Sequence, residues 1–280
     1  MPTEIQATDV RIRYASIAEA RRMSGLRLVL GAYAIPGPWR EGCKGLFHVK
    51  GIPFASVVTC GDGGADLRMG MDGADRELRE WTGQSSAPVA IWNDERPRST
   101  WIEQIALAER LNPDPPLVPS AFEDRVRMYG LCNEICGENG LGWCKRLVMV
   151  DAGLAALPAG DPGRPSMEHV GRKYGHSPDA AAHATDRIVE ILGALDRQLR
   201  EQQARGRQFL IGEHLTALDI YWATFAALFD PLPPDLCPMA TAMRGAYANH
   251  DPRTRSALTR ELIAHRDFVY RRYLELPIVF

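Results

Sequence analysis

The first part of the chain alternates short apolar runs with amphipathic stretches. An apolar run of strand length spans residues 26–34, and the turn Pro36–Gly37–Pro38 ends it, because proline and glycine disfavour the interior of a strand or a helix. Apolar residues then recur at helical spacing over residues 39–50, and Gly51 separates this helix from a second apolar run at 52–58. A helix that joins two strands of one sheet makes them parallel, so this stretch predicts a parallel strand–helix–strand unit.

The same kind of pattern continues to residue 111 and predicts an α/β domain. After the second strand we expect a Gly- and Asp-rich loop at residues 61–73, a short helix at 75–81, a buried strand at 88–92 and a helix at 99–111. An N-terminal extension, residues 1–25, precedes this domain and is expected to form a short helix around residues 17–23. The first domain is therefore placed at residues 26–111.

A proline-rich stretch divides the chain in two. It begins at Asn112 with the sequence Asn–Pro–Asp–Pro–Pro, whose prolines cannot donate backbone hydrogen bonds, so residues 112–119 are expected to form a linker. Residues 120–280 then predict an all-helical domain without strands. Its helices are expected at residues 121–134, 180–205, 217–229 and 240–273, the last with a break at Asp251–Pro252.

Two segments of this second domain carry further expectations. Within residues 180–205, apolar side chains recur at helical spacing and predict a core stripe, formed by Ile188, Ile191, Leu192, Leu195 and Leu199. Residues 151–175 are rich in Gly, Pro and Ala without a regular period, so a long exposed connection between two helices is expected there.

Composition narrows the possible partners and the location. The 33 basic and 35 acidic residues nearly cancel, which disfavours binding to nucleic acid or to an anionic membrane. The N-terminus has charges where a secretory signal needs an apolar core, and no apolar stretch approaches the ~18 residues of a membrane span. We therefore expect a cytoplasmic protein with no membrane partner.

The six cysteines predict neither a disulfide framework nor a metal site. Cys132 and Cys136 lie four residues apart in a predicted helix, and Cys144 follows, so thiolates on one face are conceivable. No histidine or second pair of closely spaced cysteines lies nearby to complete a tetrahedral site. These thiols are therefore interpreted as packing residues.

The order of elements resembles the glutathione-transferase family, and three local patterns carry the resemblance. Residues 44–54 resemble the first helix and the entry to the second strand, and residues 87–91, followed by Ser99, resemble the strand with a cis-proline and the next helix. Residues 209–220 resemble the start of the buried helix of the C-terminal domain. Together these patterns cover about residues 26–230. The resemblance implies a thioredoxin-like N-terminal domain, an all-α C-terminal helical bundle, glutathione as co-substrate and a symmetric homodimer.

One part of the third pattern has a physical reading of its own. Thr216 can cap the helix that follows it, and Asp219 can return a bond to the backbone N–H of Thr216, as in a capping box. Asp219 is therefore interpreted as a structural residue.

The resemblance implies a glutathione site built from both ends of the first domain. Ala87, the residue before Pro88, would pair its backbone with the cysteinyl part of glutathione like an added strand. Ser99 would bind the γ-glutamyl carboxylate at a helix start, with Thr100 as the alternative helix cap. The acidic residue usual before this serine is replaced by Arg98, which either strengthens carboxylate binding or is solvated.

Several groups could stabilise the thiolate of glutathione. Where serine or cysteine classes carry their activating group, this chain has Gly37–Pro38–Trp39. Tyr33 falls about where the tyrosine classes carry a phenol, and it is either that donor or a packing residue of the strand. The backbone N–H groups of Trp39 and Arg40 could serve instead.

Three further side chains on the same helix leave alternatives open. Arg40 and Lys44 either meet a carboxylate of glutathione or remain exposed cations that serve solubility. Cys43 sits one turn inside the helix and is either a packing residue or the nucleophile of a thiol exchange.

The second substrate is expected between the domains, against the first helix of the C-terminal half. The side chains expected to line its pocket are Met128, Tyr129, Cys132 and Asn133, with packing in the core as the alternative. Two functions stay open at this point. One is a transferase that adds the glutathione thiolate to a small hydrophobic electrophile or uses it to displace a leaving group. The other is a binding or interaction protein that keeps the fold without thiolate activation.

Overall fold

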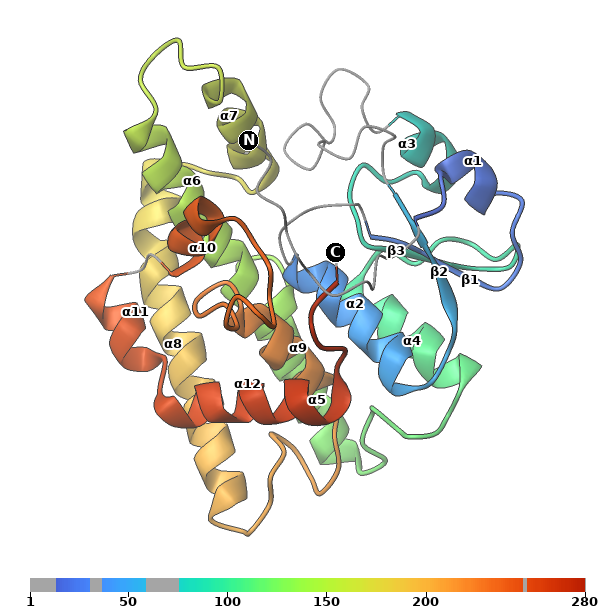
Figure 1. Ribbon diagram of the computed structural model, residues 1–280. Coiled ribbons are helices and arrows are strands. Elements are labelled where there is room, and N and C mark those ends of the chain that lie inside the picture. Colours follow the sequence, from blue (N-terminus) through green and yellow to red (C-terminus); the bar gives the residue numbers. More distant parts are fainter. Residues whose placement is uncertain (1–13, 31–36, 59–75, 249–250, 280) are drawn as a thin grey trace.

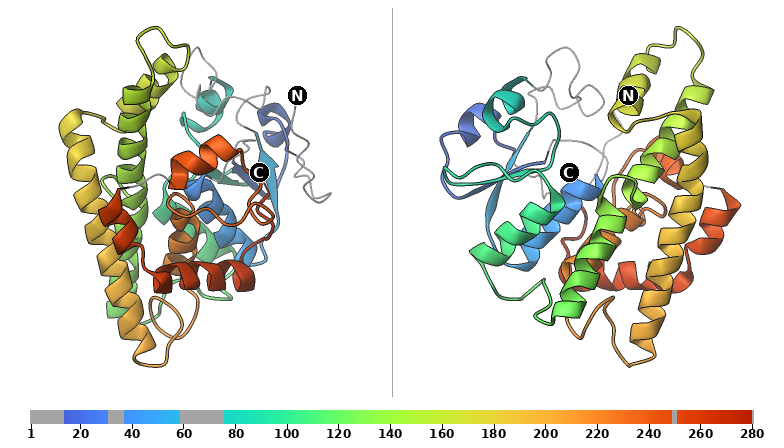
Figure 2. Two further views of the ribbon diagram at one scale, coloured as in Figure 1. Left: turned by 60° about the vertical axis from the view of Figure 1, so that its left-hand side comes forward. Right: turned by 180° about the vertical axis from the view of Figure 1, so that it is seen from behind.

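The computed structural model describes residues 14–30, 37–58, 76–248 and 251–279 (Figure 1). In these ranges a small mixed sheet and the helices packed on it form one part, and a helical bundle forms the other, as Figures 1 and 2 show. The predicted fold class, a thioredoxin-like domain followed by an all-helical domain, is therefore confirmed.

Within the described residues the sheet has three strands, in the order β2, β1, β3. Strand β1 (Leu26–Val29) runs parallel to β2 (Phe54–Val57) and antiparallel to β3 (Val89–Trp92). Helix α2 (Pro38–Val49) joins β1 to β2, which confirms the predicted parallel strand–helix–strand unit. An isolated backbone bridge adds to each edge of the sheet: Ala15 pairs with Val57 of β2, and Arg98 pairs with Ala90 of β3.

Side chains alternate between the two faces of the sheet along each strand, so both faces carry apolar side chains. Helices cover both faces. On one face Leu26, Leu28 and Ala90 join the large core beside α2 and α4 (Trp101–Leu111). On the other face a separate cluster contains side chains of the strands together with those of α1 (Ile17–Ala20) and α3 (Arg76–Thr82): Ile17, Ala20, Val29, Val57, Leu78, Val89 and Ile91. The helix expected around residues 17–23 is thus shorter than predicted and belongs to this packed layer.

The helical part contains eight helices among its described residues, which include no strand. They are α5 (Phe122–Cys136), α6 (Leu141–Ala156), α7 (Arg164–Lys173), α8 (Pro178–Gln203), α9 (Ala217–Ala226), α10 (Thr241–Ala248), α11 (Pro252–Ala257) and α12 (Arg260–Tyr273). The longest, α8, runs beside α6 (Figures 1 and 2). All five side chains of its predicted core stripe are buried. None of the helices in the described ranges combines the length and the apolar character that a bilayer span requires.

The expectation of a long exposed connection at residues 151–175 is wrong. This segment contains the last turns of α6 and all of α7. Two of its glycines, Gly153 and Gly171, lie at contacts between the two helices: a Cβ atom built on Gly153 would lie 2.8 Å from the terminal carbon of Met167. Its Pro165 lies in the first turn of α7, where proline is tolerated. Gly153 and Pro165, which are residue types common in loops, therefore lie at a close contact between helices and at a helix start.

Helix α9 is held at its start by one buried carboxylate. All ten residues of α9 are buried, and Asp219 accepts 2.8 Å hydrogen bonds from the backbone N–H and the hydroxyl of Thr216. The second oxygen accepts a 2.8 Å bond from the backbone N–H of Leu210 and lies 3.1 Å from Nε2 of His265. The predicted bond from Thr216 to Asp219 is confirmed. The carboxylate also ties α9 to the preceding loop and places it beside His265 of α12.

The two halves of the molecule meet where α2 lies against α9. At this contact the backbone of Gly42 approaches Tyr221 so closely that a Cβ atom on Gly42 would lie 2.6 Å from its ring. Tyr221 is fully buried, so the ring has little room to move away. The position of α2 relative to the bundle thus depends on the absence of a side chain at residue 42.

We expect Asp219→Ala to lower the free energy of unfolding by about 3 kcal/mol, because it leaves buried N–H and O–H donors without their acceptor. The measurement is the midpoint of urea-induced unfolding. Glu213→Ala is the matched control, since the Glu213 side chain is 69% exposed and its ion pair with Arg207 lies at the surface. Equal midpoints for the two variants would contradict the structural role of Asp219.

We expect Gly42→Ala and Gly130→Ala to change stability in opposite directions. Both glycines lie within helices, where alanine gains up to about 1 kcal/mol in helix propensity. A Cβ atom on Gly130 meets nothing within 4 Å, so only this gain applies in α5. At Gly42 the collision with Tyr221 outweighs it, and a net loss of about 1–2 kcal/mol is expected in the same unfolding measurement. Stabilisation by both substitutions would show that the contact between residue 42 and the ring of Tyr221 does not set the distance between α2 and α9.

Candidate functional site

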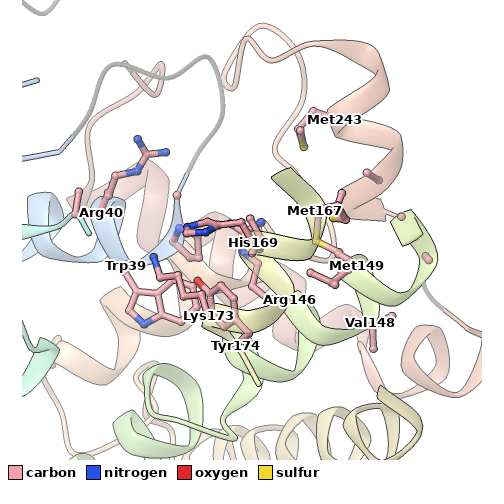
Figure 3. A pocket seen from close by; sticks show the side chains of 18 residues that line it. Trp39, Arg40, Arg146, Val148, Met149, Met167, His169, Lys173, Tyr174 and Met243 are labelled. Atoms are coloured by element: carbon pink, nitrogen blue, oxygen red, sulfur yellow. The ribbon is translucent and has the colours of Figure 1, made fainter. Parts of the chain in front are cut away.

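A cavity of about 430 Å³ lies between the two halves of the molecule (Figure 3). The sheet domain contributes the first residues of α2 and the residue before Pro88: Gly37, Pro38, Trp39, Arg40 and Ala87. The helical part contributes the remaining wall: Arg146, Val148, Met149, Val150, Ala152 and Gly153 from α6, Met167, His169, Val170, Lys173 and Tyr174 from α7 and its end, and Met243 and Ala246 from α10. The volume is within the range of small-molecule sites.

The start of α2 presents backbone donors to this cavity. Gly37 is the residue that precedes the helix, Pro38 follows in the first turn, and no side chain caps this end. Proline has no N–H group, so the first backbone N–H groups of the helix are those of Trp39 and Arg40. A helix start of this kind favours negative charge.

Aromatic rings form one side of the cavity and join it to the bundle. The indole N–H of Trp39 donates a 2.9 Å hydrogen bond to the carbonyl of Cys136, and its ring meets Phe225 edge-on with centroids 4.9 Å apart. Tyr174 lies 6.4 Å from Trp39 and packs edge-on against Trp143 at 4.8 Å. Trp39 is therefore a residue of the sheet domain whose side chain packs against, and hydrogen-bonds to, the helical part.

The peptide bond between Ala87 and Pro88 is cis, as the resemblance implied. Directly before it, the hydroxyl of Ser86 accepts a 2.5 Å hydrogen bond from Nζ of Lys173. This bond joins the end of α7 to the entry of β3, across the border between the two halves. Ala87 and Trp39, which are far apart in the sequence, thus line the same cavity.

Arg40 and Lys44 are buried, in contrast to the expectation of exposed cations on a first helical turn. Arg40 is 8% exposed and donates a 2.9 Å hydrogen bond to the carbonyl of Leu30. Its guanidinium folds back over the start of α2, since a Cβ atom on Gly37 would lie 2.3 Å from Nε of Arg40. A positive charge therefore lies beside the first turn of α2, at the edge of the cavity.

Lys44 does not line the cavity and instead holds the C-terminal end of the described chain. Its Nζ atom forms ion pairs with Glu41 at 3.1 Å and Glu275 at 3.3 Å, and it donates a 3.0 Å hydrogen bond to the carbonyl of Val279. Burial opposes the charged form, but the two carboxylates outweigh it and raise the pKa of Lys44.

The residues that follow β3 lie outside the cavity lining. Thr100, the alternative helix cap, is the residue that caps α4, in a capping box with Glu103. Ser99 precedes this cap and is half-buried. The guanidinium of Arg98 pairs with Glu95 at 2.8 Å. The helix predicted from residue 99 therefore begins at Trp101, and the binding roles of Arg98, Ser99 and Thr100 stay predictions.

The side chains expected to form the second-substrate pocket lie on α5, and none of them lines the cavity. Met128 and Cys132 are fully buried in the core, Tyr129 packs near Trp101 with ring centroids 6.4 Å apart, and Asn133 is exposed. The wall comes instead from α6, from α7 and its end, and from α10. The spacing of Met167, Val170 and Tyr174 by three and four residues is helical and was the signal in the sequence for part of this wall.

Two predicted chemical groups give different outcomes. Tyr33 lies outside the described residues, so its role stays a prediction. Cys43 is fully buried, and burial raises the pKa of its thiol well above the usual value. Cys132 and Cys136 are also free thiols in the core, and burial raises the pKa of each thiol well above its usual value. Such thiols carry little of the thiolate form that exchange chemistry needs.

The cavity has an uneven distribution of charge and apolar surface. Arg40, Arg146, His169 and Lys173 line it, whereas no aspartate or glutamate is found among the described residues of its lining. In Figure 3 Met149, Met167 and Met243 lie together on one side, Trp39 and Arg40 lie on the other, and Arg146 and His169 lie between. The site therefore combines a cationic half beside α2 with an apolar half beside α10.

A buried lysine lies directly beside this wall. Lys145 is 1% exposed, and its Nζ atom lies 5.3 Å from the ring centroid of Phe229. Burial lowers the pKa of Lys145 to about 8, and the charge of Arg146 acts in the same direction.

Comparison with known proteins places this geometry in context. Residues 178–260 match the family model described as the glutathione S-transferase C-terminal domain. No curated protein matches the chain in sequence.

Solved structures extend the similarity over most of the chain. A glutathione S-transferase from Methylobacterium radiotolerans, in complex with glutathione sulfonate, is 18% identical, with a TM-score of 0.51 over 88% of this chain and 91% of that one. A second, from Xanthobacter autotrophicus, is 13% identical, with a TM-score of 0.54 over 90% and 96%. Ure2p in complex with glutathione is 12% identical, with a TM-score of 0.53 over 84% and 99%. At these identities the similarity establishes the fold.

We expect the difference in stability between the natural chain and Lys145→Met to depend on pH. The folded-state pKa of about 8 lies below that of an unfolded lysine, so the unfolded state binds more protons between these values and the natural chain gains stability as pH rises. Its free energy of unfolding, relative to Lys145→Met, should be flat below pH ~8 and rise by about 1 kcal/mol between pH ~8 and ~9.

The measurement is urea-induced unfolding at each pH, and Arg172→Met is the control because Arg172 is an exposed cation of α7 outside the cavity lining. Stability curves for the natural chain and Lys145→Met that stay parallel across this range would contradict a lowered pKa at Lys145.

Proposed function

Because the chain is a glutathione S-transferase family protein of unassigned class, we propose that its interdomain cavity binds glutathione beside a small hydrophobic electrophile and transfers the glutathione sulfur to it. The observation that carries this proposal is the joint lining of one cavity by Ala87, by the start of α2 and by the apolar wall of the bundle. A tripeptide thiol and an electrophile would meet there.

The sheet side of the cavity suits the tripeptide. The backbone of Ala87 can pair with the cysteinyl residue of glutathione as an added strand would. Glutathione carries two carboxylates and one ammonium group, so its net negative charge matches a lining that contains Arg40 and Lys173. The crystal structures of relatives with glutathione or its sulfonate support this choice of co-substrate.

Thiolate stabilisation is assigned in this proposal to the start of α2. The sulfur would accept hydrogen bonds from the backbone N–H groups of Trp39 and Arg40, in the field of the helix and of the nearby Arg40 guanidinium. These donors are held in place before substrate binds, so they favour the thiolate over the thiol. Tyr33, for which the resemblance implies a phenol donor, is the competing candidate.

The reaction itself needs only a positioned thiolate. Its lone pair forms a bond to the electrophilic carbon, and the electron pair displaced from that carbon leaves with a leaving group or, in an addition, is taken up with a proton from water. The apolar side chains of α6, α7 and α10 would hold the electrophile next to the sulfur and reduce the access of water.

The alternatives predict different properties. A thiol exchange at Cys43 is disfavoured, because that thiol is fully buried and its pKa is raised. A binding protein without thiolate activation would use the same cavity but leave bound glutathione as the thiol. The homodimer that the resemblance implies stays a prediction, which light scattering of the purified chain can test.

The first experiment is calorimetric titration with reduced glutathione. We expect binding with a dissociation constant at or below about 1 mM, and a loss of about tenfold in Ser99→Ala if that hydroxyl holds a carboxylate. Ser120→Ala is the matched control, since Ser120 is an exposed serine outside the cavity lining. The absence of heat at several times this concentration would refute the proposal.

The ultraviolet absorbance of bound thiolate then separates activation from binding. We expect the natural chain to show thiolate absorbance at neutral pH, and Tyr33→Phe to keep it if the start of α2 is the activating group. Loss of absorbance in Tyr33→Phe with unchanged binding would assign activation to the phenol. Binding without thiolate absorbance in the natural chain would favour the non-catalytic alternative.

A further inference from the structure

The side chain of Trp39 reaches from the sheet domain to a break between two helices of the bundle. Helix α5 ends at Cys136, and α6 begins only at Leu141. The carbonyl of Cys136 is among the last four of α5, which have no partner within their own helix. The indole N–H of Trp39 donates its 2.9 Å hydrogen bond to this carbonyl. A residue of the sheet domain thus completes the hydrogen bonding of a helix end in the bundle.

The ring of Trp39 is packed tightly at the same place. It meets the ring of Phe225 on α9 edge-on, with centroids 4.9 Å apart and 74° between the planes. A Cβ atom on Gly142 of α6 would lie 2.8 Å from Cη2 of Trp39 and 2.4 Å from Cε1 of Phe225. Gly142 and Phe225 are both buried. The indole therefore cannot shift far without moving the backbone of α6 or the core around α9.

The backbone of Trp39 belongs to the first turn of α2. Trp39 is the second residue of this helix, and only two side-chain torsions separate its ring from its backbone. A ring that is fixed in the bundle therefore restricts the backbone N–H groups of Trp39 and Arg40. Gly142 lies on α6, the helix that continues to Val148 and Met149 in the cavity wall. One contact consequently holds the first turn of α2 in register with this apolar wall.

We infer that Trp39 is the positioning residue of this site: its indole, held by the carbonyl of Cys136 and by Phe225, sets where the backbone donors of α2 meet the sulfur. This inference rests on the proposed function, because those donors are the ones assigned to the thiolate. Donors stabilise a charge when they are aimed at it before it forms, and a misplacement of ~1 Å costs on the order of 10²-fold in rate. A contact that served stability alone would leave the chemistry of the bound sulfur unchanged when it is loosened.

The test measures the pKa of the thiol of bound glutathione, from its ultraviolet thiolate absorbance as a function of pH. Trp39→Phe keeps an aromatic ring but removes the indole N–H and fills less of the contact. We expect it to raise this pKa by about one unit, which is a roughly tenfold smaller ratio of thiolate to thiol. Calorimetry should show the same effect through linkage: the affinity for glutathione stays within about twofold where glutathione binds as the thiol, and falls by up to about tenfold where it binds as the thiolate.

A second variant acts on the same contact from the bundle. Gly142→Ala leaves every residue of the cavity lining in place and pushes against the rings of Trp39 and Phe225, so it should raise the pKa of the bound thiol in the same direction. Gly130→Ala is its matched control, because a Cβ atom there meets nothing within 4 Å. Trp92→Phe is the control for Trp39→Phe, since Trp92 is a half-buried tryptophan of β3 outside the cavity lining. Both controls should leave the pKa of the bound thiol unchanged.

An unchanged pKa of the bound thiol in Trp39→Phe would overturn the inference, as would an equal shift in Trp92→Phe. If Trp39→Phe does not fold, Gly142→Ala decides in the same way against Gly130→Ala. The natural chain separates this failure from that of the proposed function. A thiolate that forms on the natural chain and is indifferent to these substitutions removes the inference alone. Glutathione that does not bind, or that stays a thiol when bound at neutral pH, removes the transferase proposal and the inference with it.

Discussion

The approach of α2 to α9 at Gly42 is the contact on which the rest of the arrangement depends. Tyr221 on α9 leaves no room for a side chain at that position, so the two helices meet at one separation. Helix α9 is itself fixed at its start by the buried carboxylate of Asp219, which also binds Leu210. The start of α2, and with it Trp39 and Arg40, is therefore placed against the bundle by a contact that lies one turn away from the cavity.

Patterns that depend on neighbours in the sequence could be predicted. The core stripe of α8 and the bond from Thr216 to Asp219 follow from spacing within a few turns of helix, and the parallel strand–helix–strand unit follows from the order of three consecutive elements. The wall of the cavity could not be predicted in the same way. Gly153 and Pro165 have the composition of a loop, yet they serve a helix contact and a helix start. Whether Met128 faces a core or a cavity depends on helices far away in the sequence.

The placement of charged side chains also could not be predicted from the sequence. The formal net charge of −2 carries no sign of a cationic cavity, because it sums over the whole chain, whereas the described lining of the cavity includes cations and no carboxylate. Arg40 and Lys44 lie one turn apart on α2 and are both buried, but their partners differ. Arg40 bonds to the carbonyl of Leu30 and lines the cavity, whereas Lys44 pairs with Glu275 near the C-terminal segment. The chemistry of a cation in this fold depends on which carboxylates and carbonyls the tertiary structure brings to it.

The attachment of Lys44 to the last described residues has a consequence for the order of synthesis. Its partner carbonyl at Val279 lies 235 residues later in the chain. While the ribosome is still making the bundle, α2 lacks both this tie and the surface of α9 on which it rests. These contacts of α2 can therefore form only after the bundle has been synthesised, whichever contacts within the sheet form earlier.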